Sequence, residues 1–265
     1  MVQTTDCSES PSLSVAQFYD ALAPEYDAMT GFQKRFVHER PFFRLLAEKY
    51  KIHVALDAGC GTGFHSLLLA QLGVQVTGID VSEEMIQQAR RHATELSLPV
   101  RFIEGRSQDL RGMFDSRFDA VFCLGNTLAH SVSDDDLWMT LQNFQGVLRP
   151  GGILLLQNLN YDRILERKER VQSVKEVGAT TFVRFYDYAE DHITFNVLTI
   201  TRENGTFRTS LKTIPLRPLR SDTVVDMLRQ MDFENIKLYG GITLDTYDSH
   251  ISKDLVVIAR RKDAP

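Results

Sequence analysis

The central part of the chain alternates short apolar runs with amphipathic helical patterns, and this alternation restricts the fold more than any other feature. The run HVALDAG, residues 53–59, is short, apolar and closed by glycine, which is typical of a strand buried on both faces. Consecutive parallel strands need a crossover helix, so the alternation predicts an α/β fold with a doubly wound, mostly parallel sheet. The expected strands are 53–59, 74–80, 100–105, 118–125 and 151–159, and the expected helices are 64–73, 82–96 and 134–148.

The segments on either side of this core follow other patterns. Residues 1–12 are polar and are expected to form a disordered tail, whereas residues 13–50 contain two helical patterns. Residues 171–216 alternate polar and apolar side chains around the strong hairpin signal Asn204-Gly205, which predicts an antiparallel β insertion. We therefore expect one domain, 13–265, that carries the insertion. The α/β pattern then returns, with an expected helix at 221–231 and expected strands at 235–241 and 254–262.

A glycine-rich turn, LDAGCGTGF, follows the first expected strand and contains Gly59, Gly61 and Gly63. Glycines here allow a tight turn and let a ligand approach the N-terminus of the next helix. The dinucleotide fingerprint requires GxGxxG, but Phe64 follows Gly63, which weakens a nicotinamide oxidoreductase as a candidate. Asp57 precedes the turn, and its carboxylate would repel a pyrophosphate but attract a cation.

An acid also ends the second expected strand. Asp80 follows Gly59 by about 20 residues, where a carboxylate can accept hydrogen bonds from both hydroxyls of a ribose. S-adenosylmethionine (SAM) has a ribose, an ammonium and a sulfonium, so it suits Asp57 and Asp80 together. For either acid alone, the alternative is a helix cap or a solvated loop residue.

Three segments, LDAGCGTG, GIDVSEEM and VLRPGG, resemble the signature segments of class I SAM-dependent methyltransferases. The resemblance covers nearly the whole chain and implies a Rossmann-like, seven-stranded, doubly wound sheet whose last strand is antiparallel. It also implies SAM as the cofactor and requires no metal. Besides Asp57, Asp80 and the three glycines, the residues implied to contact SAM are Val81, Met85, Ser107, Gln108, Leu124 and Arg35.

Two further segments, VFCLGNTLAHSV and NYDRIL, are similar to the glycine N-methyltransferase group and its glycine–sarcosine relatives. The likeness implies that Asn126 lies near the acceptor amine and that Leu124 lies near the methionine part of SAM. The arginine that binds the glycine carboxylate in that group falls where this chain has Leu159. The insertion offers four side chains that could supply the missing contact: Arg184, Tyr186, Arg202 and Arg208.

Three residues are candidates for the reacting end of the site. The amide of Asn126 can donate and accept hydrogen bonds, which suits an amine or hydroxyl acceptor. His130 could take up a released proton, and the ring of Tyr26 could stabilise the sulfonium. The alternatives are that Asn126 caps a turn, that His130 is structural and that Tyr26 packs on the core. Arg35 could hold the SAM carboxylate, and Arg40 is an equal candidate.

Composition excludes several other classes. The chain of 265 residues has 30 basic and 35 acidic side chains, so no basic surface for nucleic acid is expected. Its three cysteines lack metal-ligand spacing, and no apolar run is long enough to span a membrane, which indicates a cytoplasmic protein. The insertion at 171–216 is a candidate surface for a homo-oligomer.

The sequence thus predicts a SAM-dependent methyltransferase that acts on a small molecule, most readily an amine, by direct displacement. The alternatives are an O-, S- or C-methyltransferase, a methyltransferase that acts on protein or RNA, and a non-catalytic SAM-binding module.

Overall fold

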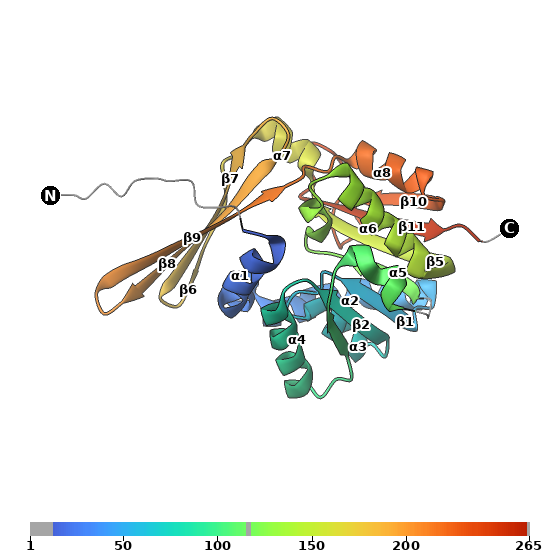
Figure 1. Ribbon diagram of the computed structural model, residues 1–265, viewed down its shortest axis with the longest axis horizontal. Helices are drawn as coiled ribbons and strands as arrows, with labels where there is room; N and C mark the ends of the chain where they lie inside the picture. The colour runs from blue at the N-terminus through green and yellow to red at the C-terminus, as the bar shows by residue number, and fades with distance from the viewer. Residues whose placement is uncertain (1–12, 115–117, 264–265) are drawn as a thin grey trace.

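A seven-stranded sheet forms the centre of the α/β part of the chain (Figure 1). The computed structural model describes residues 13–114 and 118–263, so the expected tail 1–12 lies outside the described residues. The strand order is β10-β11-β5-β4-β1-β2-β3, and only β11 runs against its two neighbours. This arrangement confirms the predicted doubly wound sheet with its reversed last strand. The strands are β1 Val54–Ala58, β2 Gln75–Asp80, β3 Arg101–Glu104, β4 Phe118–Cys123, β5 Leu148–Leu159, β10 Phe233–Tyr239 and β11 Asp254–Arg261.

Helices cover both faces of this sheet because its strands are apolar on both sides. On β5, Leu154 and Leu156 pack against one group of helices, whereas Ile153 and Leu155 pack against the other. The first group is α5 Leu110–Met113, α6 Asp134–Val147 and α8 Ser221–Gln230. The second group is α2 Phe32–Tyr50, α3 Phe64–Gln71 and α4 Glu83–Glu95.

The predicted insertion is a separate antiparallel sheet with the strand order β6-β7-β8-β9. It follows the short helix α7 Tyr161–Arg167, and its strands together span residues 171–216 as predicted. Asn204 and Gly205 both have positive φ, 49° and 82°, which matches the expected hairpin turn between β8 and β9. The strands are β6 Val171–Val177, β7 Thr180–Tyr188, β8 Ile193–Glu203 and β9 Thr206–Leu216.

Helix α1, Val15–Thr30, lies between the inserted sheet and the α/β part (Figure 1). Phe18 and Leu22 of α1 pack with Phe182 and Val197 of the inserted sheet in one hydrophobic cluster. Ser14 caps the helix through a hydrogen bond from the backbone N–H of Gln17. Within the described residues, no helix combines the length and the apolar character needed to cross a membrane.

Candidate active site

A cavity of about 560 Å³ lies at the carboxyl ends of β1, β2, β3 and β4. In a doubly wound sheet this edge is where ligands bind, because the strand order reverses there and leaves a crevice. Helix α1 contributes Tyr19 and Tyr26 to the wall opposite the sheet. The predicted site residues that line the cavity are Tyr26, Arg35, Gly59, Gly61, Asp80, Val81, Ser107, Gln108, Leu124 and His130.

The turn after β1 approaches the turn after β4 so closely that a side chain would not fit. Gly59 has φ of +75°, and an added Cβ atom would lie 2.3 Å from Cγ2 of Thr127. Gly61 has φ of +54° and its N–H donates to Oδ2 of Asp80 at 2.8 Å. Glycine is therefore required here for both conformation and space.

The carboxylate of Asp80 lines the cavity and accepts two backbone hydrogen bonds. Besides the N–H of Gly61, the N–H of Ser82 donates to it at 3.0 Å. Burial raises the pKa of Asp80 to about 6, although these two hydrogen bonds favour the ionised form. At neutral pH the cavity therefore holds a negative charge at the end of β2.

Three of the residues predicted to contact SAM do not line the cavity. Asp57 is 1% exposed and points from β1 toward α3, where its carboxylate accepts a hydrogen bond from Oγ of Ser66 at 2.6 Å. A Cβ atom on Gly63 would lie 2.9 Å from the ring of Phe102, so this glycine serves packing. Met85 belongs to the first turn of α4 and is fully buried. Asp57 therefore has no direct access to a cation in the cavity, unlike Asp80.

Asn126 also lies outside the cavity lining, because both ends of its amide are occupied. Its Nδ2 donates to the hydroxyl of Tyr161 at 2.9 Å, and its Oδ1 accepts from the N–H of Leu159 at 3.1 Å. Its φ is +71°, a conformation that asparagine tolerates better than most residues. The geometry therefore differs from the prediction that this amide holds the acceptor, because it ties the turn after β4 to α7 instead.

His130 and Tyr19 form a pair at the end of the cavity. Nε2 of His130 lies 2.8 Å from the hydroxyl of Tyr19 in a hydrogen bond. Nδ1 of His130 is buried, and the described residues offer it no hydrogen-bond partner. Burial lowers the pKa of His130 to about 4 and raises the pKa of Tyr19 well above its usual range. At neutral pH both side chains are therefore uncharged.

Tyr19 lines the cavity but was not among the predicted site residues, although its spacing from Tyr26 is a signal for it. Tyr19 and Tyr26 are seven residues apart, which places them two turns apart on one face of α1. Their rings lie 6.2 Å apart, and both line the cavity.

Two carboxylates of α1 that were not among the predicted site residues hold this helix across the cavity. Asp20 accepts a hydrogen bond from Oγ of Ser82 at 2.6 Å, next to Asp80. Asp27 accepts from Oγ1 of Thr62 at 2.7 Å and forms an ion pair of 3.1 Å with Nε2 of His92. Because α1 supplies the wall of the cavity, these contacts keep the site closed.

Arg35 lines the cavity, whereas Arg40 is exposed outside it. The Nε atom of Arg35 lies 2.6 Å from a carboxylate oxygen of Glu39, and its guanidinium lies 4.1 Å from the centre of the Phe64 ring. Of the two arginines that the sequence left open, the geometry therefore favours Arg35 as a ligand for an anion in the cavity.

The inserted sheet turns its four candidate side chains in different directions. Arg184 and Tyr186 lie on the face that packs against α1, because they are two and four residues from Phe182 on the same strand, and Phe182 packs against α1. Arg202 lies on the opposite face, and Arg208 is exposed near the β8–β9 hairpin. Of the three arginines, Arg184 is therefore the one that shares the face packed against α1 without lying near the exposed hairpin. Burial raises the pKa of Tyr26, and the charge of Arg184 opposes that rise.

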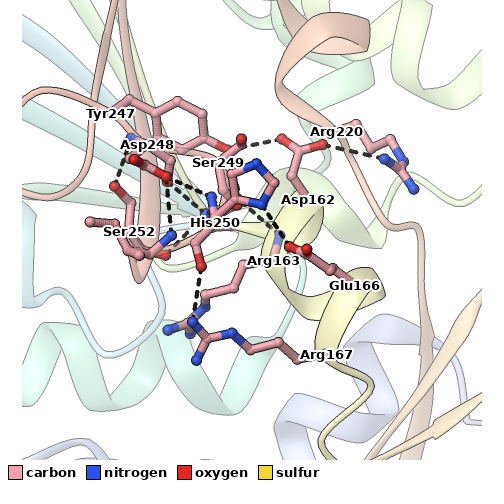
Figure 2. A network of polar contacts seen from close by, with 12 residues as sticks. Asp162, Arg163, Glu166, Arg167, Arg220, Tyr247, Asp248, Ser249, His250 and Ser252 are labelled. Atoms are coloured by element: carbon pink, nitrogen blue, oxygen red, sulfur yellow. Dashed lines mark hydrogen bonds and ion pairs between the residues drawn. The ribbon is translucent and has the colours of Figure 1, made fainter.

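A second cavity, of about 400 Å³, lies between α7 and the loop before β11, and its charges are mostly paired (Figure 2). The Tyr247 hydroxyl donates to a carboxylate oxygen of Asp162 at 2.9 Å, and Arg220 pairs with the same carboxylate at 3.7 Å. His250 pairs with Glu166 at 2.8 Å. This network fixes α7, whose first residue, Tyr161, receives the hydrogen bond from Asn126.

The comparisons with known proteins agree with this architecture. Residues 55–152 match the family described as a methyltransferase domain. A glycine/sarcosine N-methyltransferase of Aphanothece halophytica is 29% identical over 252 residues, which cover 93% of this chain and 90% of that protein. Human glycine N-methyltransferase is 34% identical over 125 residues, 42% of each protein.

Solved structures show the same fold at low sequence identity. A SAM-dependent methyltransferase from Clostridium acetobutylicum superimposes with a TM-score of 0.78 at 14% identity, covering 92% of this chain and 99% of that one. The sugar N-methyltransferase KedS8 from Streptoalloteichus gives a TM-score of 0.70 at 17% identity, with 99% of each chain covered. Residues 55–152 are thus a methyltransferase domain, and the glycine turn, the acidic strand end and these relatives together indicate an enzyme that uses SAM.

Proposed function

We propose that the protein transfers the methyl group of SAM to the nitrogen of a small amine. The observation that carries this proposal is the pair of uncharged side chains, Tyr19 and His130, at the end of the cavity. A histidine with a pKa of about 4 is a weak base, so it takes little part in removing a proton at neutral pH. A hydroxyl acceptor needs a stronger base to remove its proton and make it a good nucleophile, whereas a neutral amine is nucleophilic without losing a proton.

The residues of the cavity fit SAM. Asp80 would accept hydrogen bonds from the ribose hydroxyls, and the backbone around Gly59 and Gly61 would lie against the methionine part. Arg35 would pair with the SAM carboxylate, whereas Ser107 and Gln108 would lie at the adenine. SAM supplies a methyl group bonded to a sulfonium, which is already a good leaving group.

The protein's own contribution to such a transfer is alignment and exclusion of water. Tyr19 and Tyr26 would close the site through α1, and Tyr26 would present its ring to the sulfonium, a contact worth about 0.5–2 kcal/mol. The burial that lowers the pKa of His130 would also lower the pKa of an amine bound beside it, which favours the neutral, reactive form. Asn126 would act indirectly, by positioning Tyr161.

Within the amines, we propose an acceptor that carries an anionic group, with Arg184 as its partner. The known relatives that support this act, by their names, on glycine and sarcosine. Nε of Arg184 donates to Oγ of Ser173 at 2.7 Å, which leaves the outer nitrogens of its guanidinium for a second partner. Burial raises the pKa of Tyr26, and the positive charges of Arg35 and Arg184 oppose that rise, which indicates that Arg184 lies close to the site.

The test uses SAM with an isotopically labelled methyl group and matched acceptor pairs, such as glycine and glycinamide, followed by mass spectrometry. Label on nitrogen supports the proposal, and label on oxygen, sulfur, carbon or a macromolecule contradicts it. SAM binding without any transfer would instead support a non-catalytic module.

Arg184 is tested separately in the same assay. Arg184→Ala should raise the KM of glycine at least tenfold and leave that of glycinamide unchanged, with Arg208→Ala as the matched control. If the wild-type protein uses both acceptors equally well, N-methylation stands and the role of Arg184 is wrong.

A further inference from the structure

The inserted sheet has an outer face, opposite α1, on which a row of apolar side chains crosses all four strands. Val174, Val183, Leu198 and Leu211 pair directly across the four strands and make one row. Directly paired residues share a face of an antiparallel sheet, and this row alternates with Phe182 and Val197, which pack against α1. The row therefore points away from the rest of the protein.

Several apolar side chains of the outer face are more exposed to solvent than is usual for valine, leucine and phenylalanine. Val174 is 61% exposed and Leu211 is 57% exposed at the two ends of the row. On the same face, Val171 is 56% exposed and Phe207 is 70% exposed. None of the four hydrophobic clusters among the described residues contains any side chain of the row.

The size of the outer face matches a protein interface. Four strands spaced about 4.8 Å apart and roughly 30 Å long present on the order of 600 Å² in projection. Side chains make the accessible surface larger than the projection, and a stable interface buries about 800 Å² on each partner. The whole face is therefore of the size that a stable interface needs, with the apolar row across its strands.

Among the described residues, no hydrophobic cluster includes the side chains of this row. Residues 1–12, MVQTTDCSESPS, are nearly all polar or small, so their sequence offers few apolar side chains to match a row of valine and leucine. The charges next to the row have both signs, with Glu176 and Arg202 on the same face, which does not favour an anionic membrane surface. A central apolar strip with charges of both signs at its border is the pattern of a homodimer interface.

We infer that the outer face binds the outer face of a second copy of this chain, in a two-fold symmetric dimer of stacked sheets. Two twisted sheets pack face to face with their strands about 30° apart, and their inner side chains interdigitate. A two-fold contact uses the same row on both copies, so a single apolar surface is sufficient. The inference is independent of the acceptor.

The dimer would also stabilise the position of α1, which forms one wall of the cavity. The inner face of the same sheet packs against α1, which carries Tyr19 and Tyr26 into the cavity. A four-stranded sheet covered on only one face is weakly supported, and a second sheet on its outer face would hold it, and therefore α1, in place.

The experiment measures the mass of the full-length protein in solution by light scattering and sedimentation velocity over a wide concentration range. The wild-type protein should have twice the chain mass of 30.2 kDa. The variant with Val174→Lys and Leu211→Lys should be a monomer. The control with Val37→Lys and Ile251→Lys changes side chains that are 77% and 68% exposed elsewhere, and it should remain a dimer.

Circular dichroism and thermal unfolding show whether each variant folds. If the double lysine variant does not fold, Leu211→Ser provides the milder change and should weaken the dimer measurably. A wild-type protein that is monomeric at every concentration overturns the inference, as does a folded lysine variant that stays dimeric. An assembly larger than a dimer that survives the lysine substitutions overturns it as well.

Discussion

Replacement of Asp80 by asparagine tests how the site binds its cofactor. The carboxylate faces the cavity and accepts hydrogen bonds from the N–H groups of Gly61 and Ser82 at 2.8 and 3.0 Å. Asparagine removes the charge and one of the two acceptor oxygens. Hydrogen bonds to a charged group contribute about 1.5–3 kcal/mol, so the affinity for SAM should fall roughly tenfold to a hundredfold.

The same carboxylate predicts how SAM binding depends on pH. Burial raises the pKa of Asp80 to about 6, so the ionised form that accepts ribose hydroxyls decreases as the pH falls through that value. SAM affinity should therefore be constant above about pH 7 and should approach a tenfold loss per pH unit well below pH 6.

The stability of the ligand-free protein should change in the opposite direction. An acid whose pKa is raised on folding favours the folded state below its unfolded pKa, and this benefit is lost as the pH rises through about 6. A shift of about two units corresponds to an upper limit of about 3 kcal/mol, reduced because the carboxylate faces the cavity. The ligand-free protein should thus unfold more easily at pH 7 than at pH 5.

Isothermal titration calorimetry with SAM from about pH 5 to pH 8 measures the affinity, and urea unfolding over the same range measures the stability. Asp222→Asn, on the exposed side of α8, is the control and should behave as the wild type. SAM affinity that is equal at pH 5 and pH 8, or an Asp80→Asn variant that binds SAM normally, would refute the reasoning.

Three further predictions concern the parts around the cavity. Gly59→Ala should lower the free energy of unfolding by about 2–4 kcal/mol, because the Cβ atom of the alanine would lie 2.3 Å from Cγ2 of Thr127. Urea unfolding measures this loss, and a second substitution in the same chain, Thr127→Gly, should restore part of it. Asn126→Ala leaves the hydroxyl of the buried Tyr161 without its donor, so it should lower the free energy of unfolding by about 1–3 kcal/mol and reduce kcat more than the affinity for SAM. Steady-state kinetics and calorimetry measure the two effects, and a larger loss of SAM affinity than of kcat would contradict the prediction. Asp27 raises the pKa of His92, so their ion pair stabilises α1 below about pH 6.5 and weakens as the pH rises. Amide hydrogen exchange in α1, corrected for intrinsic rates, should therefore be slower at low pH. His92→Gln should remove this pH dependence.

The sequence allowed most of the fold to be predicted because its signals are local. Apolar runs of five or six residues closed by glycine mark buried strands, and their alternation with helices requires parallel pairing. The change of period at residue 171 and the Asn204-Gly205 turn define the inserted sheet to within a residue. The face of that sheet that packs against α1 could not be predicted, because either face has enough apolar side chains.

Which residues line the cavity was predictable where position along the backbone decides the edge of the sheet that a residue occupies. Gly59, Gly61 and Asp80 lie at strand ends, and the cavity brings them together. Asp57 also lies near a strand end, but it does not line the cavity because its side chain points toward Ser66 of α3. A residue's place beside a turn is a property of the sequence, but the direction of its side chain depends on the register of the neighbouring elements.

Asn126 shows the same limit over a longer distance. The hydrogen-bond partners of its amide are Tyr161 and the backbone of Leu159, more than thirty residues away along the chain. Nothing in the segment VFCLGNTLAH indicates these partners, and a free amide at a strand end is a reasonable expectation from the segment alone. The pairing exists because β5 lies next to β4 and delivers α7 beside the turn.

The two sides of the cavity have different origins in the chain. The sheet edge, with Gly59, Gly61 and Asp80, belongs to the α/β platform that methyltransferases share, and it suits the cofactor. The opposite wall comes from α1, which is held on one side by the carboxylates of Asp20 and Asp27 and on the other by the inserted sheet. Under the proposed N-methylation, the acceptor would lie between the cofactor and this wall, so α1 and the insertion rather than the shared fold would select it. Leu159 has no charge to offer at the sheet edge, so the contact with an anionic group of the acceptor is assigned in that proposal to Arg184 of the insertion.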